Sequence, residues 1–356
     1  MEKRLSEFRK RLSRREIAAA LITNEKNIAY LCNYRFEDGC LLVTESDAYL
    51  ITDFRYKEEA EKLALSAFSV VTPVDKTAFV ADALKKASAT SLGYESRSMT
   101  VQEYHQYENS LSLSLVPMGD ILLQMRAQKS EEEICAIKTA QSISEKAYLH
   151  LLSVLRPDMT ERDVATELAY FMEKNGAQGK SFDIIAASGK ASSLPHAKCR
   201  NLQISQGFLT IDFGCIYQGY CSDTTRTLVV GKASDEMKRV YNTVLEAQKA
   251  AIAFIKEGVL CADADARARS VIERAGYGSA FGHSLGHGVG LDVHELPALS
   301  PRATETVLKA GNIVTVEPGI YLEGKFGSRI EDMGLVTKNG FENFTKISKE
   351  LTELFV

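Results

Sequence analysis

The sequence predicts a small α/β domain followed by a larger α+β domain. Up to about residue 122, short apolar runs alternate with helical patterns, which is typical of a small α/β fold. Beyond residue 130, two pairs of amphipathic helical patterns are separated by strand-rich stretches. With 356 residues, of which 45% are hydrophobic and 25% are charged, the chain is long enough for two domains with their own cores. We place these domains at residues 1–124 and 130–356.

The first domain is expected to open with an amphipathic helix within residues 1–16, where Arg and Lys interleave with Glu. We do not expect a signal peptide there, because no apolar stretch follows the basic residues. Helical patterns follow at 54–65, 75–88 and 100–109. Short apolar runs predict strands at 18–22, 40–43, 49–52, 68–71 and 113–116.

The second domain is expected to begin with two capped helices. The sequence Ser130-Glu131-Glu132-Glu133 is a capping box, and it predicts a helix that continues to about Leu155. A second helix is expected to begin after Thr160 and to stop at Asn175-Gly176, a favourable C-cap. Strands should then continue to about residue 231, followed by helices near 234–256 and 262–275 and a strand-rich segment.

Composition narrows the class of protein. The net charge of −4 gives no general reason to expect nucleic acid or a membrane surface as a partner. The sequence contains no run of 18 apolar residues of the kind that spans a membrane. Seven cysteines, an odd number scattered without paired spacing, favour free thiols in a reducing compartment. We therefore expect a cytoplasmic protein.

Two acidic residues eleven positions apart, Asp212 and Asp223, lie in a segment with the pattern of a β-hairpin. An even-length loop centred between Tyr217 and Gln218 would place the two carboxylates directly opposite each other, with Cβ atoms roughly 5 Å apart. Like charges in that position destabilise a sheet unless a pKa is raised or a cation lies between them. The hairpin therefore predicts a metal site.

A second hairpin, turning about Gly324, repeats the pattern, because its register places Glu317 opposite Glu331. Neutral imidazole is the commonest protein ligand for metals. The segment 281–295, between the hairpins, has glycines that fit neither a dinucleotide-binding loop nor a P-loop. The same segment contains three of the six histidines of the chain, which are His283, His287 and His294.

Together these motifs resemble the proline-specific metallopeptidases of the pita-bread fold, which include Xaa-Pro dipeptidase (prolidase), aminopeptidase P and, more distantly, methionine aminopeptidase. The matching segments are Ile-Asp-Phe-Gly with Ser-Asp-Thr-Thr-Arg, Gly-His-Gly-Val-Gly-Leu-Asp-Val-His-Glu, Val-Glu-Pro-Gly and Arg-Ile-Glu-Asp. The likeness spans residues 130–356, and the preceding region is compatible with a creatinase-like N-terminal domain. The resemblance implies an α/β creatinase-like domain, an α+β pita-bread catalytic domain and a homodimer.

The family pattern implies two divalent metal ions per subunit. By position, Asp212 and Asp223 would hold the first ion, His287 and Glu317 the second, and Asp223 and Glu331 would bridge them. Four carboxylates balance the charge of two divalent ions, so a site that repels itself when empty is neutral when loaded. Oxygen-rich ligation with one imidazole suits Mn²⁺, our first choice, and also Co²⁺ or Zn²⁺.

The resemblance also implies the reaction, which is hydrolysis of the Xaa-Pro bond at the N-terminus of dipeptides or short peptides. Glu317 is the candidate for proton transfer to the leaving nitrogen. His294 resembles the family residue that contacts the scissile carbonyl and stabilises the developing oxyanion. Arg329 shares a strand face with Glu331, where it could orient that ligand or bind a substrate carboxylate.

Two further histidines are assigned to the substrate side. His196, in the sequence Leu194-Pro195-His196, resembles a family histidine near the substrate, although residues 187–193 lack the Gly-x-Asn usually found before it. His283 is either a wall of the substrate pocket or a packed structural histidine. The chain has no tryptophan, whereas many aminopeptidases P have one near the pocket, so both dipeptidase and aminopeptidase preferences stay open.

Two alternatives from other functional classes share the fold. Creatinase-like enzymes hydrolyse a guanidino compound without metal, and some pita-bread proteins are non-catalytic peptide-binding modules that have lost their ligands. The presence of all five ligand residues argues against both alternatives.

Overall fold

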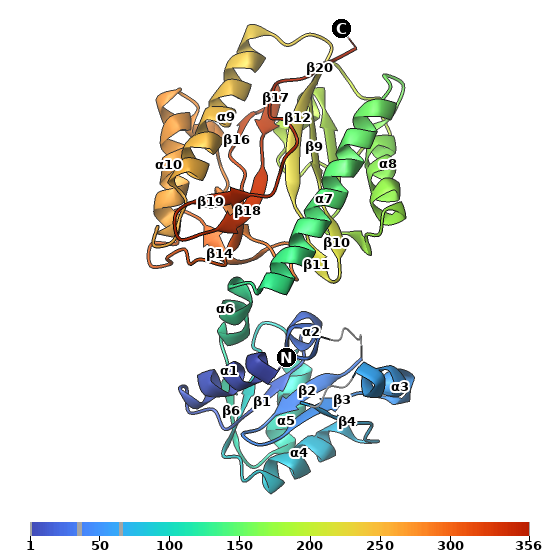
Figure 1. The fold of residues 1–356 in the computed structure, drawn as a ribbon, viewed down its shortest axis with the longest axis vertical. Helices are drawn as coiled ribbons and strands as arrows, with labels where there is room; N and C mark the ends of the chain where they lie inside the picture. Colours follow the sequence, from blue (N-terminus) through green and yellow to red (C-terminus); the bar gives the residue numbers. More distant parts are fainter. Residues whose placement is uncertain (1, 34–37, 64–66, 356) are drawn as a thin grey trace. The chain divides into compact units, whose positions relative to one another are not determined.

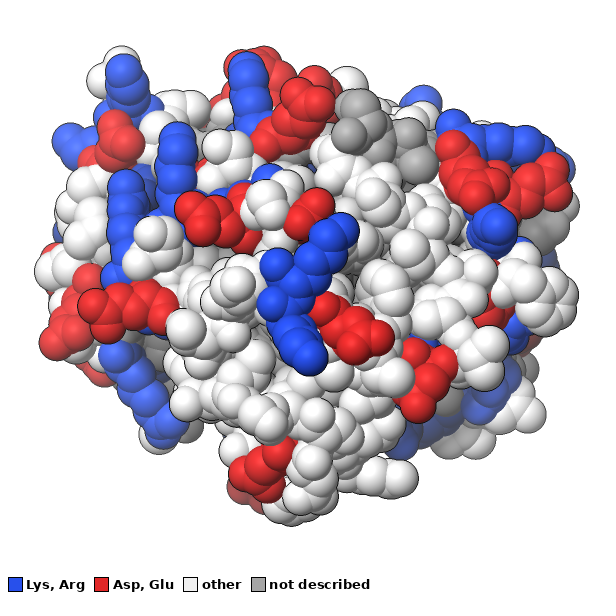
Figure 2. Space-filling view, turned by 90° about the horizontal axis from the view of Figure 1, so that it is seen from below, with Lys and Arg blue, Asp and Glu red and all other residues white. Residues whose placement is uncertain are grey.

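The computed structural model describes residues 2–33, 38–63 and 67–355. It divides into two compact units, Met1–Arg126 and Ala127–Val356 (Figure 1). Each unit has a hydrophobic core of its own. Basic and acidic side chains lie interspersed over the face of the molecule that Figure 2 shows.

The first unit is built on one six-stranded sheet. Its strands are β1 (Ala19–Ile22), β2 (Cys40–Val43), β3 (Ala48–Ile51), β4 (Ser69–Val71), β5 (Ser91–Tyr94) and β6 (Ser114–Pro117), in the order β4-β3-β2-β1-β5-β6. Its helices are α1 (Glu2–Ser13), α2 (Glu25–Cys32), α3 (Phe54–Leu63), α4 (Lys76–Lys86), α5 (Val101–Ser110) and α6 (Ile121–Ala127). All four residues of β1 are fully buried, which indicates that the sheet is covered on both faces.

Three elements of this unit, α2, β5 and α6, are absent from the sequence-based prediction. The glycine in β5 weakens it as an isolated strand, but β5 is paired on both sides, by β1 and β6. Gly93 is needed there because a Cβ would lie 2.8 Å from the side chains of Ile17 and Met118. The predicted helix 54–65 is described as far as Leu63 in α3, and its last two positions lie outside the described residues.

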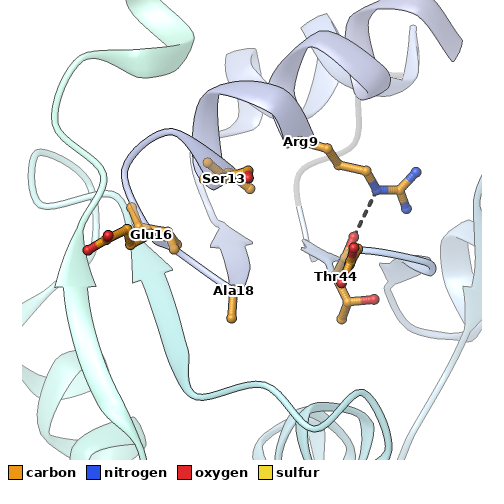
Figure 3. Close-up of a pocket in the computed structure, with 8 residues that line it drawn as sticks. Arg9, Ser13, Glu16, Ala18 and Thr44 are labelled. Carbon is orange, nitrogen blue, oxygen red and sulfur yellow. Dashed lines mark hydrogen bonds between the residues drawn. The ribbon is translucent and has the colours of Figure 1, made fainter.

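A cavity of about 290 Å³ lies between α1 and the connection from β2 to β3 (Figure 3). Arg9 donates a hydrogen bond from Nε to the carbonyl oxygen of Thr44 at 2.8 Å, and another from Nη2 to that of Asp47 at 2.8 Å. Ser13 and Glu16 also line the cavity. The bonds of Arg9 hold α1 against the sheet.

The second unit has two helix pairs that flank a set of small sheets (Figure 1). The helices are α7 (Glu131–Val154), α8 (Glu161–Lys174), α9 (Asp235–Phe254) and α10 (Cys261–Arg274), with short 3₁₀ helices η1 (Gly189–Ser193) and η2 (Gly278–Ala280). α7 opens with the predicted capping box, in which the Ser130 hydroxyl accepts from Glu133 N and the Glu133 carboxylate accepts from Ser130 N. α8 ends as predicted, with Asn175 as its C-cap and Gly176 at a φ of 99°.

The strands of the second unit carry the carboxylates of interest. They are β7 (Gly179–Lys180), β8 (Ile185–Ser188), β9 (Gly207–Phe213), β10 (Cys215–Tyr217), β11 (Tyr220–Cys221), β12 (Thr224–Val230), β13 (Gly286–Gly288), β14 (Glu295–Leu299), β15 (Ile313–Val316), β16 (Gly319–Leu322), β17 (Phe326–Arg329), β18 (Asp332–Val336), β19 (Phe341–Asn343) and β20 (Glu353–Leu354). Hydrogen-bonded neighbours follow the orders β11-β10-β7, β20-β12-β9-β8, β14-β13-β15-β18-β19 and β16-β17.

Two apolar clusters fix the helices to these strands. Leu168 of α8 and Phe213 of β9 belong to one cluster. Val244 of α9 and Val316 of β15 belong to the other. The strands that hold the carboxylates are therefore backed by packed helices. Within the described residues, no helix is both long and apolar enough to cross a membrane.

Candidate metal centre

Asp212 and Asp223 come from a hairpin, as expected, but its register differs from the prediction. Asp212 is paired with Thr225, so the predicted direct pairing with Asp223 is wrong. The turn residues are Gln218-Gly219, with φ of 49° and 83°, and this turn centre lies one position later than expected. The register therefore shifts by two residues. Because side chains alternate along a strand with a period of two, the two carboxylates still share one face, as diagonal neighbours.

The second pair of carboxylates, Glu317 and Glu331, keeps its predicted register. The ladders β15–β18 and β16–β17 lie on either side of this pair and share one register, which places Glu317 opposite Glu331. Glu317 N donates to the carbonyl oxygen of Leu285 at 2.8 Å, and Glu331 N donates to that of Thr225 at 3.1 Å. These bonds tie the second hairpin both to the strand of His287 and to the first hairpin.

The predicted ligands converge in overlapping groups. One group consists of Asp212, Asp223 and Glu331, and another of His287, Glu317 and Glu331. Within each group the ligand atoms lie within 4.8 Å of one another. Glu331 belongs to both groups, so the arrangement has the form of two centres that share a carboxylate.

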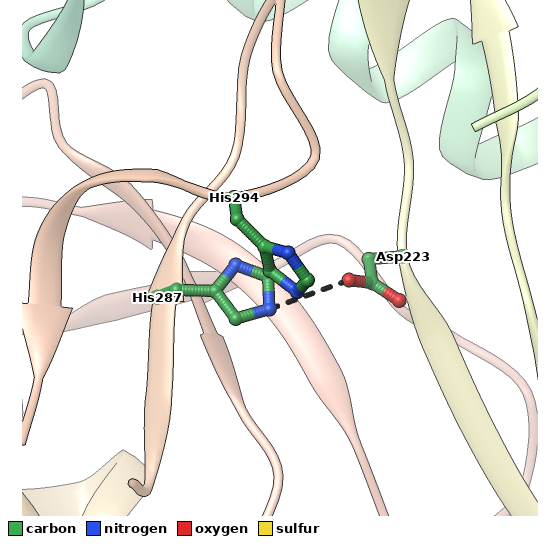
Figure 4. A group of neighbouring side chains, drawn as sticks. All are labelled: Asp223, His287 and His294. Carbon is green, nitrogen blue, oxygen red and sulfur yellow. Dashed lines mark ion pairs between the residues drawn. The ribbon is translucent and has the colours of Figure 1, made fainter. Parts of the chain in front are cut away.

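His287, in β13, directs one ring nitrogen at the carboxylates. Its Nδ1 lies 3.1 Å from the carbonyl oxygen of Gly288, which can only accept, so Nδ1 carries a proton. Its Nε2 lies 3.2 Å from Glu317 Oε1. The same nitrogen lies 3.5 Å from Asp223 Oδ2, as Figure 4 shows. Burial opposes the charge of His287, but the hydrogen bond and charge of Glu317 outweigh it and raise the pKa of His287 to about 9. Burial likewise opposes the charge of Glu317, and His287 lowers the pKa of Glu317 to about 2.

The other three carboxylates are crowded and largely buried. Burial raises the pKa of Asp212, Asp223 and Glu331, and neighbouring carboxylates raise it further. Among the described residues, the buried oxygens Asp212 Oδ1 and Glu331 Oε1 have no hydrogen-bond partner. Such oxygens are costly to bury unless a cation takes up their lone pairs. Four carboxylates and one imidazole with these properties fit divalent metal ions.

Arg329, which is 4% exposed, orients two of the clustered carboxylates, Asp212 directly and Glu331 through the Thr225 hydroxyl. Its Nη2 donates to Asp212 Oδ2 at 2.7 Å. Its Nε donates to the Thr225 hydroxyl at 3.0 Å, and that hydroxyl donates to Glu331 Oε2 at 2.8 Å. Its Nη1 donates to the Tyr321 hydroxyl at 2.7 Å. Thr225 and Tyr321 are not among the residues predicted from the sequence.

A period-two spacing is the signal that could have revealed Tyr321. Gly319 is the cross-strand partner of Arg329, and Tyr321 lies two residues later on the same face. The ring of Tyr321 crosses Gly319, where a Cβ would lie 2.6 Å from the Tyr321 hydroxyl. A glycine at position 319 therefore leaves the space through which Tyr321 reaches Arg329.

The histidines assigned to the substrate side occupy different positions. His283 Nδ1 lies 2.8 Å from the carbonyl oxygen of Ser284, so its Nε2 accepts a hydrogen bond from the Tyr321 hydroxyl at 3.0 Å. His294 is exposed, and its ring lies 4.2 Å from the ring of His287 (Figure 4). Its ring is nonetheless partly surrounded by protein, and this partial desolvation, followed by the nearby charge of His287, lowers the pKa of His294. His196 is exposed and follows Pro195, whose carbonyl oxygen accepts from Arg329 Nη1 at 3.2 Å.

A buried arginine, also absent from the prediction, holds the back of the site. Arg226, 1% exposed, donates from Nη2 to Asp332 Oδ1 at 2.8 Å and from Nη1 to the carbonyl oxygen of Glu331 at 2.6 Å. It also donates to the carbonyl oxygens of Ile347 and Ser348, each at 3.0 Å. These bonds tie β12 to β18 and to the segment after β19, directly behind Glu331.

Comparisons with known proteins agree with this geometry. The model of the Creatinase/Prolidase N-terminal domain matches residues 4–128, and the model of Metallopeptidase family M24 matches residues 135–338. An uncharacterised peptidase of Bacillus subtilis is 40% identical over 354 residues, which cover 98% of this chain and 99% of that protein.

Solved structures extend the likeness to the whole fold. An Xaa-Pro dipeptidase from Bacillus anthracis is 41% identical with a TM-score of 0.96, covering 99% of each chain. An X-Pro aminopeptidase from Thermotoga maritima is 37% identical with a TM-score of 0.89, covering 95% of this chain and 98% of that one. The predicted fold class, a creatinase-like α/β domain followed by a pita-bread α+β domain, is confirmed. The chain therefore belongs to Metallopeptidase family M24 and has a creatinase/prolidase N-terminal domain.

Proposed function

We propose that the protein is a metal-dependent exopeptidase that hydrolyses the Xaa-Pro bond at the N-terminus of dipeptides or short peptides. The main support is the pair of ligand groups that share Glu331 and that include two buried oxygens without a partner among the described residues. The substrate class is supported by the Xaa-Pro dipeptidase and the X-Pro aminopeptidase, which resemble this chain along nearly its whole length.

Two divalent ions are assigned to the ligand groups. Asp212 and Asp223 would hold one ion, His287 and Glu317 the other, with Asp223 and Glu331 shared between them. When bound, such ions supply a water of lowered pKa and polarise the scissile carbonyl. Mn²⁺ is our first choice because the donors are mainly carboxylate oxygens, and Co²⁺ or Zn²⁺ are alternatives.

The residues around the ligands supply proton transfer and orientation. Glu317 Oε1 is held by the Thr315 hydroxyl at 3.2 Å, and Glu317 accepts a proton from the attacking water and passes it to the leaving nitrogen. His294 borders the ligand group and is open to solvent, where it can donate a hydrogen bond to the developing oxyanion. Each of the three guanidinium nitrogens of Arg329 donates to a protein group, which supports a role in orienting Asp212 and Glu331 more than a role in binding a substrate carboxylate.

His283 and His196 are assigned to the substrate side. Both ring nitrogens of His283 have protein partners, which supports a role as a wall of the pocket and not as a proton carrier. His196 follows the Pro195 carbonyl that contacts Arg329, so it lies at the border of the same site.

Proline sets a particular problem for a peptidase. The nitrogen of an Xaa-Pro bond has no hydrogen, so a peptidase that recognises that N–H binds the bond poorly. An enzyme specific for this bond must instead accept the ring and recognise carbonyls and termini. A metal centre bordered by His283 and His294 is suited to that kind of recognition.

The candidate ligand residues also bear on the two alternative functions. A creatinase-like hydrolase without metal, or a non-catalytic peptide-binding module, would not require the complete set of ligands that this chain retains. Between dipeptidase and aminopeptidase, the relatives do not decide, because both types have similar identity to this chain.

The experiment is metal analysis of the purified protein together with a peptide panel. Ala-Pro and Met-Pro should be cleaved much faster than Ala-Ala and Met-Ala, and chelation should abolish the activity. Comparable rates for both sets would remove the proline assignment. Cleavage of Ala-Pro-Ala at or above the rate for Ala-Pro would select the aminopeptidase, and a metal-loaded protein that cleaves none of these peptides would favour the binding module.

Two properties beyond the reaction are proposed as well. All seven cysteines are free, which supports a reducing compartment such as the cytoplasm. A homodimer is proposed on the family resemblance, and light scattering of the purified protein would test it.

A further inference from the structure

A buried ion pair lies beneath the loop that carries His294. Lys129 Nζ and Glu295 Oε1 are 2.5 Å apart, and the two side chains are 1% and 2% exposed. Charged side chains are rarely buried to this extent unless they are paired, and removal of one partner leaves an uncompensated charge in the interior. The pair is outside the ligand set, and the proposed mechanism gives it no role.

Glu295 is the loop end of the pair. Its carboxylate lies against Gly290, where a Cβ would come within 2.3 Å of Glu295 Oε1. Gly290 N donates to the carbonyl oxygen of Asp292 at 2.9 Å, and Cys221 N donates to that of Gly290 at 2.8 Å. The carboxylate therefore fills the inside of the loop formed by residues 290–295, and this loop is anchored to β11.

Lys129 is the fixed end of the pair. It lies between α6 and α7, directly before Ser130, the N-cap of α7. Its backbone N donates to the carbonyl oxygen of Gly311 at 2.9 Å, and Asn312 Nδ2 donates to that of Ala127 at 2.8 Å. The backbone of Lys129 is thus held by the second unit itself, so its ammonium group provides an anchor for the loop.

The location of Glu295 determines the location of His294. His294 directly precedes Glu295, and Glu295 is paired with Gly288, the residue after His287. The rings of His294 and His287 meet at an interplanar angle of 84° with centroids 4.2 Å apart (Figure 4). A shift of Glu295 would therefore move the His294 imidazole away from His287.

We propose that Lys129 is a positioning residue for His294. Its buried ion pair with Glu295 holds the loop of residues 290–295, so that the His294 imidazole stays beside the ligand His287. The inference rests on the proposed function, in which His294 contacts the scissile carbonyl. Lys129 itself touches neither the substrate nor the ligand atoms.

The kinetic test compares Lys129→Met, Glu295→Gln and a control, Leu168→Ala. Leu168 is fully buried in α8, so its truncation destabilises the fold through a cavity without touching the loop. Both pair variants should lower kcat about 100-fold with KM and metal content nearly unchanged, because a shift of about 1 Å in a catalytic group can cost that much. The control should lose far less kcat than either pair variant, because Leu168 packs behind β9 and contacts neither the loop nor a candidate ligand.

A double-mutant cycle separates positioning from a general structural effect. In a His294→Ala background, Lys129→Met should lower kcat little further, because the residue on which it acts is gone. An equal loss of kcat with and without His294 would overturn the inference, as would loss of metal in Lys129→Met. Glu295→Gln, which keeps the shape of the side chain, serves the same cycle if Lys129→Met does not fold.

Hydrogen–deuterium exchange gives a readout that does not depend on peptide hydrolysis. Amides of residues 288–296 should exchange faster in Lys129→Met than in both the wild type and Leu168→Ala, and unchanged exchange would overturn the inference. If the wild type cleaves no Xaa-Pro peptide, the proposed function fails, whereas the exchange result still decides whether Lys129 holds the loop.

Discussion

Asp223→Asn should stabilise the metal-free protein and at the same time remove its response to metal. The carboxylate oxygens of Asp212, Asp223 and Glu331 lie within 4.8 Å of one another. At that separation, with an effective dielectric constant of about 20, two unit charges repel by about 3 kcal/mol. The free-energy cost of this repulsion cannot be much larger, because one carboxylate can instead take up a proton. Keeping a carboxyl group protonated at pH 7 costs at most about 4 kcal/mol when its pKa in the unfolded chain is about 3.9.

Removal of one charge should therefore stabilise the metal-free protein by about 3 kcal/mol. A domain of this size gains about 2–4 °C in Tm per kcal/mol, so its Tm should rise by roughly 6–12 °C. The assay is thermal unfolding of chelated wild type and variant with increasing Mn²⁺. The wild type should start lower and rise with Mn²⁺, whereas Asp223→Asn should start higher, stay constant and show no turnover.

Asp292→Asn, in the glycine-rich segment outside the ligand set, is the matched control and should cost much less activity. An Asp223→Asn variant that unfolds at or below the temperature of metal-free wild type would refute the argument from charge crowding. One that still gains stability from Mn²⁺ would refute the ligand assignment, and equal loss of turnover in both variants would do the same.

Other predictions concern residues around the carboxylates. Glu317→Gln should cut kcat severely, whereas Arg329→Ala should keep most of its metal and act on ligand orientation or substrate handling. Metal analysis and steady-state kinetics that show the opposite pattern would exchange the roles of the two residues. Tyr321→Phe removes a hydrogen bond to Arg329 and should lower kcat/KM about tenfold at constant metal content, since such bonds to charged groups contribute about 1.5–3 kcal/mol; wild-type kinetics would contradict this. Burial raises the pKa of Glu161, but hydrogen bonds, first from Arg200, outweigh burial and lower the pKa. Glu161 therefore stabilises the fold at pH values above its unfolded pKa of about 4.3, and this stabilisation is lost as the pH falls through the lower folded pKa. Urea denaturation of Glu161→Gln should show a loss of about 1–2 kcal/mol at pH 7, less than for a fully buried pair because the Arg200 side chain is partly exposed. The loss should shrink toward pH 3, and a constant difference would count against the ion pair.

The residues proposed as ligands could be identified in the sequence because each lies in a short motif, and the structure brings them together. The register of the second hairpin was predictable for a similar reason, because Gly324, with φ of 70°, occupies the centre of the turn between Leu322 and Phe326. The first hairpin allowed two turn centres one position apart, and either centre keeps the carboxylates on one face. The choice depends on Gln218 at φ of 49°, a conformation that a glutamine does not indicate in a sequence.

The contacts that hold the site could not be predicted, because they join residues far apart in the chain. Lys129 and Glu295 are separated by 166 positions, and Arg226 and Asp332 by 106. Their pairing depends on how α7, β12 and β18 pack, which no local pattern encodes. β5 is a similar case, because its pairing with β1 and β6 compensates for a weak strand sequence.

The bonds of Arg226 have a consequence for synthesis of the chain on the ribosome. Arg226 reaches the carbonyl oxygens of Ile347 and Ser348, and β20 pairs with the end of β12, the strand that begins directly after Asp223. The first unit has every strand of its sheet once residue 117 has emerged, so it can fold early, as N-terminal domains generally do during translation. In contrast, β12 gains its parallel neighbour β20 only after residue 354 has emerged. The bonds of Arg226 to Ile347 and Ser348 can therefore form only when nearly the whole chain has emerged, so the candidate ligand group reaches its final support late in the maturation of the protein.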